Sequence, residues 1–307
     1  MLDQTVTSAG KRAAFKEALH DAEILQLPGA ISPLCARLIE AKGFGGFYIS
    51  GAVLSADLGL PDIGLTTAGE VIGRAGQMTS ASNLPALLDA DTGFGEPANV
   101  ARTVAQIEAA GIAACHIEDQ VMPKRCGHLD NKTLVPVHDM VRKIRAAAGA
   151  KRSSDFTLVA RTDAVGTEGL EAAAERARAY VAAGADAIFA DALADEHDFK
   201  VFRRAVDVPL IANMTEFGKN RLLDKGTLQD LGYNAVLYPV TMLRLAMHAM
   251  EEGLDVIARD GTQLGLVGRM QHRAELYELL NYKAYGTYDA TIANFTVPHA
   301  AKPGDLE

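Results

Sequence analysis

The sequence is poor in several residue types and patterns, and each shortage narrows the range of protein classes. It has no tryptophan and only 3 cysteines among 307 residues, at positions 35, 115 and 126. Cysteines with no regular spacing argue against a disulfide framework and fit a reducing compartment. No run of about 18 apolar residues occurs, so the sequence predicts no membrane span.

Signals for charged partners and for secretion are also missing. The net charge is −9, and basic residues nowhere form more than a short cluster. This balance argues against nucleic acid as a partner. The segment from Met1 to Gly10 is polar and lacks the apolar core of a signal peptide. We therefore expect a cytoplasmic protein.

The sequence does contain a repeated alternation of short apolar runs and alanine-rich amphipathic segments. Runs that are apolar almost throughout are typical of strands buried on both faces of a parallel sheet. We predict strands at Ile24–Leu27, Gly46–Ser50, Pro85–Asp91, Ala113–Glu118, Thr157–Asp163, Ala187–Asp191, Val208–Asn213 and Ala235–Tyr238. The intervening segments predict helices, among them Pro97–Ala110, Val137–Ala148, Glu168–Ala183 and Thr241–Glu252. Gly184 and Gly253 follow the last two, as expected at helix ends.

This alternation predicts an α/β fold, the (β/α)8 TIM barrel, with residues 1–307 as a single domain. A doubly wound open sheet is the alternative. No predicted strand leads into a Gly-x-Gly-x-x-Gly turn, which argues against a dinucleotide-binding version of it. Residues 254–307 exceed what the barrel needs. Within them, Met270–Tyr285 predicts a helix too apolar to stand alone, and we expect this C-terminal extension at a subunit interface.

Polar residues gather where the predicted strands end, which is where a TIM barrel carries its active site. Side chains alternate in direction along a strand, so residues two apart share a face. By this parity the barrel mouth receives Tyr48 and Ser50, Asp89 and Asp91, His116 and Glu118, Arg161 and Asp163, Asp191, and Asn213 with Thr215. The predicted pocket is therefore polar and largely acidic.

The acidic wall predicts a bound cation, because burying several carboxylates unpaired is costly. Oxygen donors favour Mg²⁺ or Mn²⁺ over Zn²⁺. We predict that Asp89 and Asp91 bind this metal; the alternative is that they cap the following helix. A zinc site joining Cys115 and His116 to the later cysteine and histidine is disfavoured, because adjacent residues of a strand point to opposite faces.

One loop carries a chemically distinctive cysteine. Cys126 lies in the segment Lys124 to His128, beside two cations and a glycine. Neighbouring positive charge lowers the pKa of a thiol and makes it available for proton transfer, nucleophilic attack or metal ligation. An exposed structural cysteine is the alternative. No lysine ends a predicted strand, so a Schiff-base aldolase would lack a nucleophile.

Together these motifs resemble the isocitrate lyase/phosphoenolpyruvate mutase superfamily. The resemblance is carried, in order along the chain, by Tyr48 to Gly51, Leu58 to Asp62, Asp89 to Gly95, His116 to Gln120, Lys124 to His128, Ala160 to Asp163 and Asn213 to Gly218. The loop from Lys124 to His128 is specific to the lyase branch. With the segment from Met270 to Tyr277, it points to the members that cleave 2-methylisocitrate.

The resemblance implies a barrel whose last helix is exchanged between subunits, in a homotetramer. It implies Mg²⁺ near Asp89 and Asp91, with Asp62 and Glu118 in support. The implied reaction is cleavage of 2-methylisocitrate to pyruvate and succinate, in propionate catabolism through the methylcitrate cycle. The implied substrate contacts are Ser50, Gly51, Ala52, Cys126, Gly127, Arg161, Asp191, Asn213, Thr215, Arg244 and Arg273.

Retro-aldol chemistry suggests how the implied catalytic residues would act. These residues are Cys126, Tyr48, Glu118 and Arg161. The metal would lower the pKa of the substrate hydroxyl, with Tyr48 as the nearby proton acceptor. Arg161 would stabilise the carbanionic product and Cys126 would protonate it, on a loop that also suggests a lid.

Two departures from the family pattern bear on substrate choice. Asp191 stands where these lyases usually carry glutamate, and Ala52 stands where they usually carry a second glycine. A single methyl group changes binding by only about 1–3 kcal/mol. Lyases for isocitrate or 2,3-dimethylmalate therefore remain alternatives, and so does a non-catalytic carboxylate-binding barrel.

Overall fold

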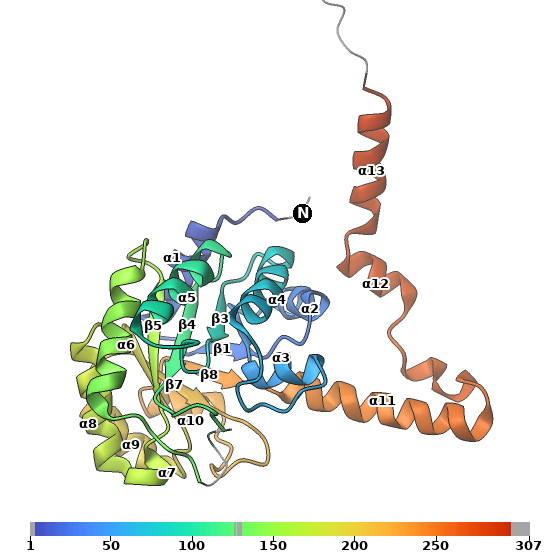
Figure 1. Ribbon diagram of the computed structural model, residues 1–307. Coiled ribbons are helices and arrows are strands. Elements are labelled where there is room, and N and C mark those ends of the chain that lie inside the picture. The colour runs from blue at the N-terminus through green and yellow to red at the C-terminus, as the bar shows by residue number, and fades with distance from the viewer. Residues whose placement is uncertain (1–3, 126, 128–130, 296–307) are drawn as a thin grey trace, which may run out of the picture.

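Eight parallel strands arranged as a barrel confirm the predicted fold class (Figure 1). The structure, a computed structural model, describes residues 4–125, 127 and 131–295. The strands are β1 Leu25–Pro28, β2 Phe47–Ile49, β3 Ala86–Asp89, β4 Ala114–Glu118, β5 Thr157–Thr162, β6 Ala187–Ala190, β7 Leu210–Asn213 and β8 Ala235–Tyr238. Each overlaps its predicted range, because strands buried on both faces leave a continuous apolar signal.

The barrel closes between its first and last strands. β8 pairs with β1 in parallel, with Ala235 opposite Leu25. On the other side of β1, Gly29 forms a parallel bridge to Tyr48, and the Ala30 N–H donates to the Tyr48 carbonyl at 2.9 Å. A Cβ on Gly29 would lie 2.0 Å from the Pro239 carbonyl oxygen. Only glycine therefore permits this closure.

Helices alternate with the strands and surround them (Figure 1). They are α2 Pro33–Ala41, α3 Gly51–Asp57, α4 Ala68–Ala81, α5 Pro97–Ala109, α6 Val137–Ala150, α7 Val165–Glu168, α8 Leu170–Ala182, α9 Glu196–Ala205 and α10 Lys225–Asp230. Their apolar faces pack on the outside of the sheet, where Cys115 is fully buried. Cys35 is partly buried against the same cluster.

Helix α1 (Ser8–Ala18) seals the end of the barrel where the strands begin. Phe15 and Leu19 join the cluster of apolar side chains inside the barrel. The buried Lys11 Nζ donates to the carbonyls of Thr79 at 2.7 Å and Ser82 at 2.6 Å, at the end of α4. With this end filled, the polar chemistry of the barrel is confined to the opposite mouth.

Two predicted helix boundaries are wrong. The predicted helix Glu168–Ala183 is divided at Gly169, whose φ of 91° ends α7 before α8 begins. Gly253 does not end the helix that follows β8, because α11 runs through it from Thr241 to Asp260 and ends at the left-handed Gly261. An interior glycine costs a helix only about 1 kcal/mol, so the helix continues where its apolar pattern continues.

The predicted helix Met270–Tyr285 is also wrong as one element. It comprises α12 (Arg273–Leu279) and the start of α13 (Tyr282–Ala293). Asn281 between them has a φ of 53°, a conformation that asparagine tolerates and a helix interior does not. The break at Asn281 was not predicted, because the residues on both sides of it favour a helix.

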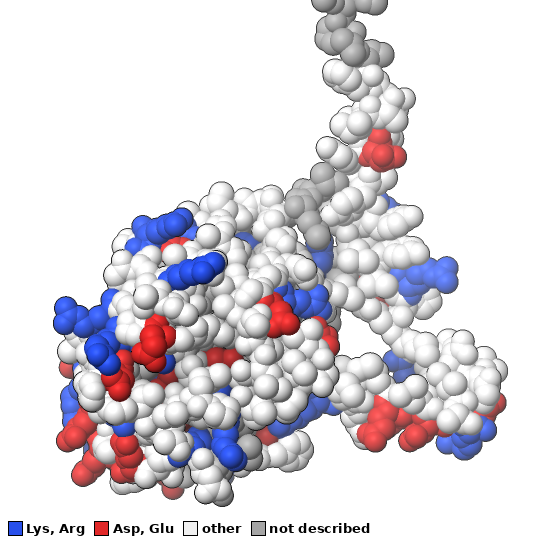
Figure 2. All heavy atoms as spheres, viewed as in Figure 1, with Lys and Arg blue, Asp and Glu red and all other residues white. Residues whose placement is uncertain are grey.

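The chain after β8 projects away from the barrel as an arm of α11, the 3-10 helix η1 (Leu264–Arg269), α12 and α13 (Figure 1). None of the 20 residues of α11, all of them described, is buried. Large apolar side chains such as Leu254 and Leu264 are 66% and 76% exposed, and Figure 2 shows wide uncharged areas on the arm. No helix in the described part of the chain has the length and hydropathy needed to cross a bilayer.

Candidate active site

The structure brings the two aspartates after β3 together at the barrel mouth. A Cβ on Gly51, at the start of α3, would lie 3.0 Å from Asp89 Oδ2 and 3.3 Å from Asp91 Oδ1. The Gly51 N–H donates to Asp89 Oδ2 at 3.1 Å, and the Asp91 N–H donates to Asp89 Oδ1 at 3.0 Å. Asp91 has a φ of 46°, so the chain turns back at this point and both carboxylates face the same space.

The two aspartates differ in charge state because their neighbours differ. Burial, reinforced by the charge of Asp89, raises the pKa of Asp91 to about 6. Burial also acts to raise the pKa of Asp89, but His116, Lys124 and Arg161 outweigh it and hold that pKa below its ordinary value. Two adjacent carboxyls thus titrate apart, as expected for like charges in one site.

Lys124 lies between the acidic side chains at this mouth. Its Nζ is 2.8 Å from Asp91 Oδ1 and also pairs with Asp62, in the segment after α3. Burial acts to lower the pKa of Lys124, but Asp89, Glu118 and Asp91 outweigh it and raise that pKa above its ordinary value. The ammonium therefore stays charged, and it is the group that connects Asp62 to the site.

Tyr48 and His116 form a buried pair on β2 and β4. The Tyr48 hydroxyl lies 2.8 Å from His116 Nε2 and donates to Asp89 Oδ2 at 3.4 Å. Burial raises the pKa of Tyr48 well above its ordinary value and lowers the pKa of His116 to about 4. Both rings are therefore neutral at pH 7, and hydrogen bonds through the Tyr48 hydroxyl link His116 to the Asp89 carboxylate.

Arg161 on β5 holds a second group of carboxylates. Its guanidinium lies 3.3 Å from Glu118 Oε2, 3.0 Å from Asp163 Oδ1 and 2.7 Å from Asp191 Oδ2. One side of the guanidinium covers the ring of Phe189, with Cζ 4.9 Å from the ring centroid. Burial raises the pKa of Glu118 well above its ordinary value, although Arg161 opposes this shift. Three carboxyls thus share one guanidinium in a dry environment.

Side chains behind the strands fix these acids. Asp119 accepts hydrogen bonds from the Thr162 hydroxyl at 2.8 Å, from the Asp163 N–H at 2.9 Å and from the Tyr180 hydroxyl at 2.8 Å. Asn213 on β7 donates to Asp191 Oδ1 at 3.0 Å. The backbone of Asp163 is therefore held by Asp119, after β4, and the side chain of Asp191 is held by Asn213 on β7.

The loop after β4 folds into the mouth. Gln120 holds Arg125 by two 2.8 Å hydrogen bonds, one to its carbonyl and one from its N–H. The Lys132 ammonium donates to the Gly127 carbonyl and lies 3.4 Å from Asp163 Oδ1. Cys126 and His128, which the sequence singled out, lie outside the described residues. Their described neighbours Arg125 and Gly127 are held by hydrogen bonds to Gln120 and Lys132.

Some predicted site residues are at the mouth and others are not. Ser50 is buried just before α3, Ala52 lies in its first turn, and Thr215 is buried beyond β7. Arg244 on α11 instead pairs with Glu216, 3.3 Å away, and stacks on Phe217. Arg273 is exposed on α12, in the arm. Within one chain, neither arginine pairs with the carboxylates that Arg161 and Lys124 hold at the strand ends.

Sequence reasoning gave no direct role at the site to four residues that the structure places in this network. His116 and Asp163 had the right strand parity but received no role, and Lys124 was considered only as part of the charged loop around Cys126. No sequence pattern indicated Lys132, because no helix or strand periodicity relates it to its partners Gly127 and Asp163. A contact across a loop leaves no periodicity to detect.

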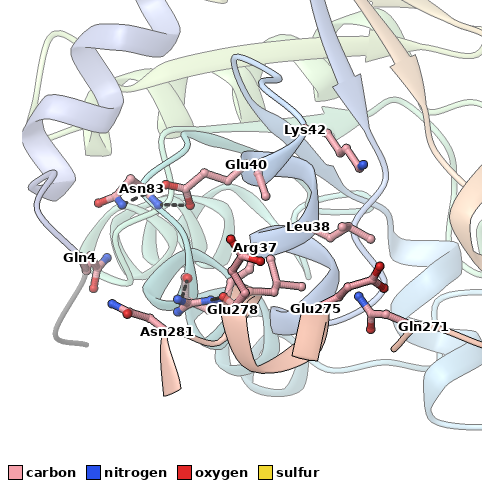
Figure 3. A pocket seen from close by; sticks show the side chains of 13 residues that line it. Gln4, Arg37, Leu38, Glu40, Lys42, Asn83, Gln271, Glu275, Glu278 and Asn281 are labelled. Atoms are coloured by element: carbon pink, nitrogen blue, oxygen red, sulfur yellow. Dashed lines mark hydrogen bonds between the residues drawn. The ribbon is translucent and has the colours of Figure 1, made fainter. Parts of the chain in front are cut away.

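Open cavities border the arm, away from the carboxylates at the strand ends. One of about 950 Å³ is lined by α11 together with Glu216 and Phe217. Another, of about 720 Å³, lies between α2 and α12, where Arg37 donates to the Leu279 carbonyl at 3.0 Å (Figure 3). Neither contains the strand-end acids. The chemistry therefore belongs to the barrel mouth, which the loop with Lys124 and Gly127 fills.

Comparison with known proteins identifies the family. Residues 15–258 match the family model described as phosphoenolpyruvate phosphomutase. The chain belongs to this family. It is 54% identical over 296 residues to "Probable 2-methylisocitrate lyase 2" of Corynebacterium glutamicum, covering 96% of each chain. It is 46% identical to 2-methylisocitrate lyase of Shewanella oneidensis, over 91% of this chain and 95% of that one. The resemblance seen in the sequence motifs is thereby confirmed.

Solved structures of the same superfamily share the fold. The crystal structure of 2,3-dimethylmalate lyase matches with a TM-score of 0.86 and 32% identity, covering 96% of this chain and 99% of that one. Phosphonopyruvate hydrolase in complex with oxalate and Mg²⁺ matches with a TM-score of 0.82 and 30% identity, covering 93% and 99%. Members with different reactions thus share one barrel, so the reaction must be argued from the site.

Gly127 offers a direct test of how closely the loop fits the mouth. A Cβ at this position would lie 1.7 Å from Asp191 Oδ2 and 2.5 Å from Arg161 Nη2. We expect Gly127→Ala to lower the free energy of unfolding by about 1–3 kcal/mol, measured by urea denaturation, because overpacking forces the neighbours apart. Gly73→Ala in α4, where a Cβ meets nothing within 4 Å, serves as the control. Equal stability of the two variants would contradict the close fit.

Proposed function

We propose that the protein is a carbon–carbon lyase that cleaves 2-methylisocitrate to pyruvate and succinate with a divalent metal. The observation that carries this proposal is the pairing of an aspartate cluster, Asp89 with Asp91, and a guanidinium, Arg161, at one barrel mouth. An aspartate pair suits a cation that binds an α-hydroxy acid, and a guanidinium suits the second carboxylate-bearing fragment. The relatives that are 46–54% identical carry the corresponding name.

The residues present fit a magnesium ion. Glu118 Oε1 is buried without a hydrogen-bond partner among the described residues, and it faces the same mouth as Asp89 and Asp91. No group of three or more His, Cys, Asp or Glu within the described ranges is placed to hold a metal by itself. Mg²⁺ usually keeps several waters and takes only one or two carboxylates, so Asp89 and Asp91 would suffice, with Asp62 and Glu118 bonded to those waters.

The metal, when bound, lowers the pKa of the substrate hydroxyl and polarises the product ketone. The protein supplies the remaining groups. We assign the acceptance of the hydroxyl proton to Tyr48, which is neutral and can take up this proton only as it passes its own proton to the neutral His116, 2.8 Å away. As the bond between the hydroxyl carbon and its neighbour breaks, the electron pair moves to the succinate half. Arg161 stabilises that charge where it develops.

The last step is protonation of the succinate carbanion. We assign this proton to Cys126, on the loop whose described neighbours Arg125 and Gly127 are fastened at the mouth. One proton leaves the hydroxyl and one enters the carbanion, so the reaction is balanced without a further reactant. We further propose substrate contacts from Ser50, Gly51, Ala52, Asn213 and Thr215, of which Gly51 lies beside Asp89 and Asn213 beside Asp191.

The alternative substrates remain related hydroxy acids. Asp191, shorter by one methylene than the usual glutamate, still reaches Arg161 at 2.7 Å. Its carboxylate is therefore engaged within the protein, and Ala52 adds one methyl group to the wall. The 32% identity to 2,3-dimethylmalate lyase is lower than the identity to the methylisocitrate lyases, which supports 2-methylisocitrate as the substrate.

The arm supports a homo-oligomeric assembly, expected to be a tetramer. α11 follows β8 but projects away from the barrel (Figure 1), and its apolar side chains are exposed. Large exposed apolar surfaces are typical of subunit interfaces. A second copy of the chain would cover α11, and Arg273 on the arm could then contact the active site of that copy. The free thiols of Cys35 and Cys115 support a cytoplasmic location.

A substrate panel tests the proposed function. We expect pyruvate and succinate from 2-methylisocitrate in the presence of Mg²⁺, and no turnover with EDTA, because the hydroxyl would keep its ordinary pKa. Isocitrate would yield glyoxylate and 2,3-dimethylmalate would yield propionate, so coupled assays of these products separate the alternatives. Turnover that survives EDTA, or none with any of the three acids, would refute the proposal.

Replacement of the loop thiol tests the assigned acid. We expect Cys126→Ser to keep the fold and the affinity for Mg²⁺ but to lose at least about 100-fold in kcat, because a hydroxyl is a far weaker acid than a thiol. Circular dichroism and calorimetric metal titration check the two retained properties. Cys35→Ser, away from the mouth, is the matched control. A kcat near that of the wild type in Cys126→Ser would rule out the acid role.

The aspartate pair makes the metal affinity depend on pH. Metal binding needs both carboxyls ionised, and the pKa of Asp91 is raised to about 6. As pH falls through this value the proton competes with the metal, so we expect the affinity for Mn²⁺ to fall about tenfold between pH 7.5 and pH 5. Isothermal titration at both pH values measures this. Asp91→Asn should bind weakly at both, and an unchanged wild-type affinity would contradict the assignment.

A further inference from the structure

Lys124 is the described cation closest to the proposed metal ligands. Its side chain is 4% exposed, and its Nζ pairs with Asp62 and lies 2.8 Å from Asp91 Oδ1. Buried lysines are rare unless paired, and the described partners of this one are acids of the proposed metal site. Among the described residues, Lys124 is the side chain that pairs with Asp91. The lysine is thus the present counter-ion of Asp91.

A divalent cation would need the same carboxylate. Mg²⁺ binds oxygen at about 2.1 Å, so a cation on Asp91 Oδ1 would lie within about 5 Å of an ammonium 2.8 Å from that oxygen. Even in a medium as polar as water, repulsion between a double and a single positive charge at that distance changes an equilibrium constant by about tenfold. The site is buried, so the effect is not smaller than this.

We propose that the Lys124 ammonium competes with the divalent cation for Asp91, so that the lysine sets the metal affinity of the enzyme. This inference rests on the proposed metal site. Coupling of two ligands at one group is reciprocal, so a bound metal weakens the hold of Lys124 on Asp62 and Asp91 by the same factor. Lys124 therefore neutralises Asp91 when the metal is absent, and the metal neutralises it when bound.

Neutral replacements of the lysine test this competition. In the full-length protein without substrate, we expect Lys124→Met and Lys124→Gln to bind Mg²⁺ and Mn²⁺ at least about tenfold more tightly than the wild type, by isothermal titration. Lys124→Arg, which keeps the charge, should stay close to the wild type. Lys16→Met on α1, at the closed end of the barrel, removes the same charge from the surface and should not change the affinity.

The outcomes distinguish this inference from the function on which it rests. Metal binding by the wild type with equal or weaker binding by both neutral variants overturns the competition and leaves the metal site intact. Binding by none of these proteins overturns the metal site and the competition with it. If one neutral variant fails to fold by circular dichroism, the other decides. The melting temperature gives a second measure, since Mg²⁺ should raise it more in Lys124→Gln than in the wild type.

Discussion

The balance of buried charge at the barrel mouth is the constraint on which the rest of this structure depends. Carboxylates arrive there from four strands, and they can be buried together only because Arg161 and Lys124 lie among them. Breaking such a pair by removing one partner leaves a charge unpaired in a dry site. The barrel maintains this arrangement, together with helix α1, which seals the end where the strands begin, and the loop that folds into the mouth.

The same balance gives chemically identical side chains different states. Asp89 is ionised because cations surround it, whereas Asp91 and Glu118 are shifted toward the protonated form by burial. A site of this kind can hold a metal at one carboxyl and handle protons at another.

Much of the fold could be predicted because local sequence patterns, the apolar runs and the alternation along strands, indicate it. All eight strands were found from continuous apolar runs, and the acids at their ends from strand parity. The errors fell where local preference and tertiary context disagree. Gly253 lies inside a helix that continues past it, and Asn281 interrupts a segment of helical composition. The pairing of Arg244 with Glu216 is a contact that no spacing along the sequence reveals.

The sequence by itself determined the barrel, the ring of polar residues at its mouth and the family to which the chain belongs. It could do so because burial and strand direction follow from the order of residues. Only the tertiary structure decided which charges meet. The pairing of Lys124 with Asp62 and Asp91, and of Lys132 with Gly127, joins loops to strands across the mouth. Such contacts depend on where chain segments lie in space, which periodicity along the chain does not encode.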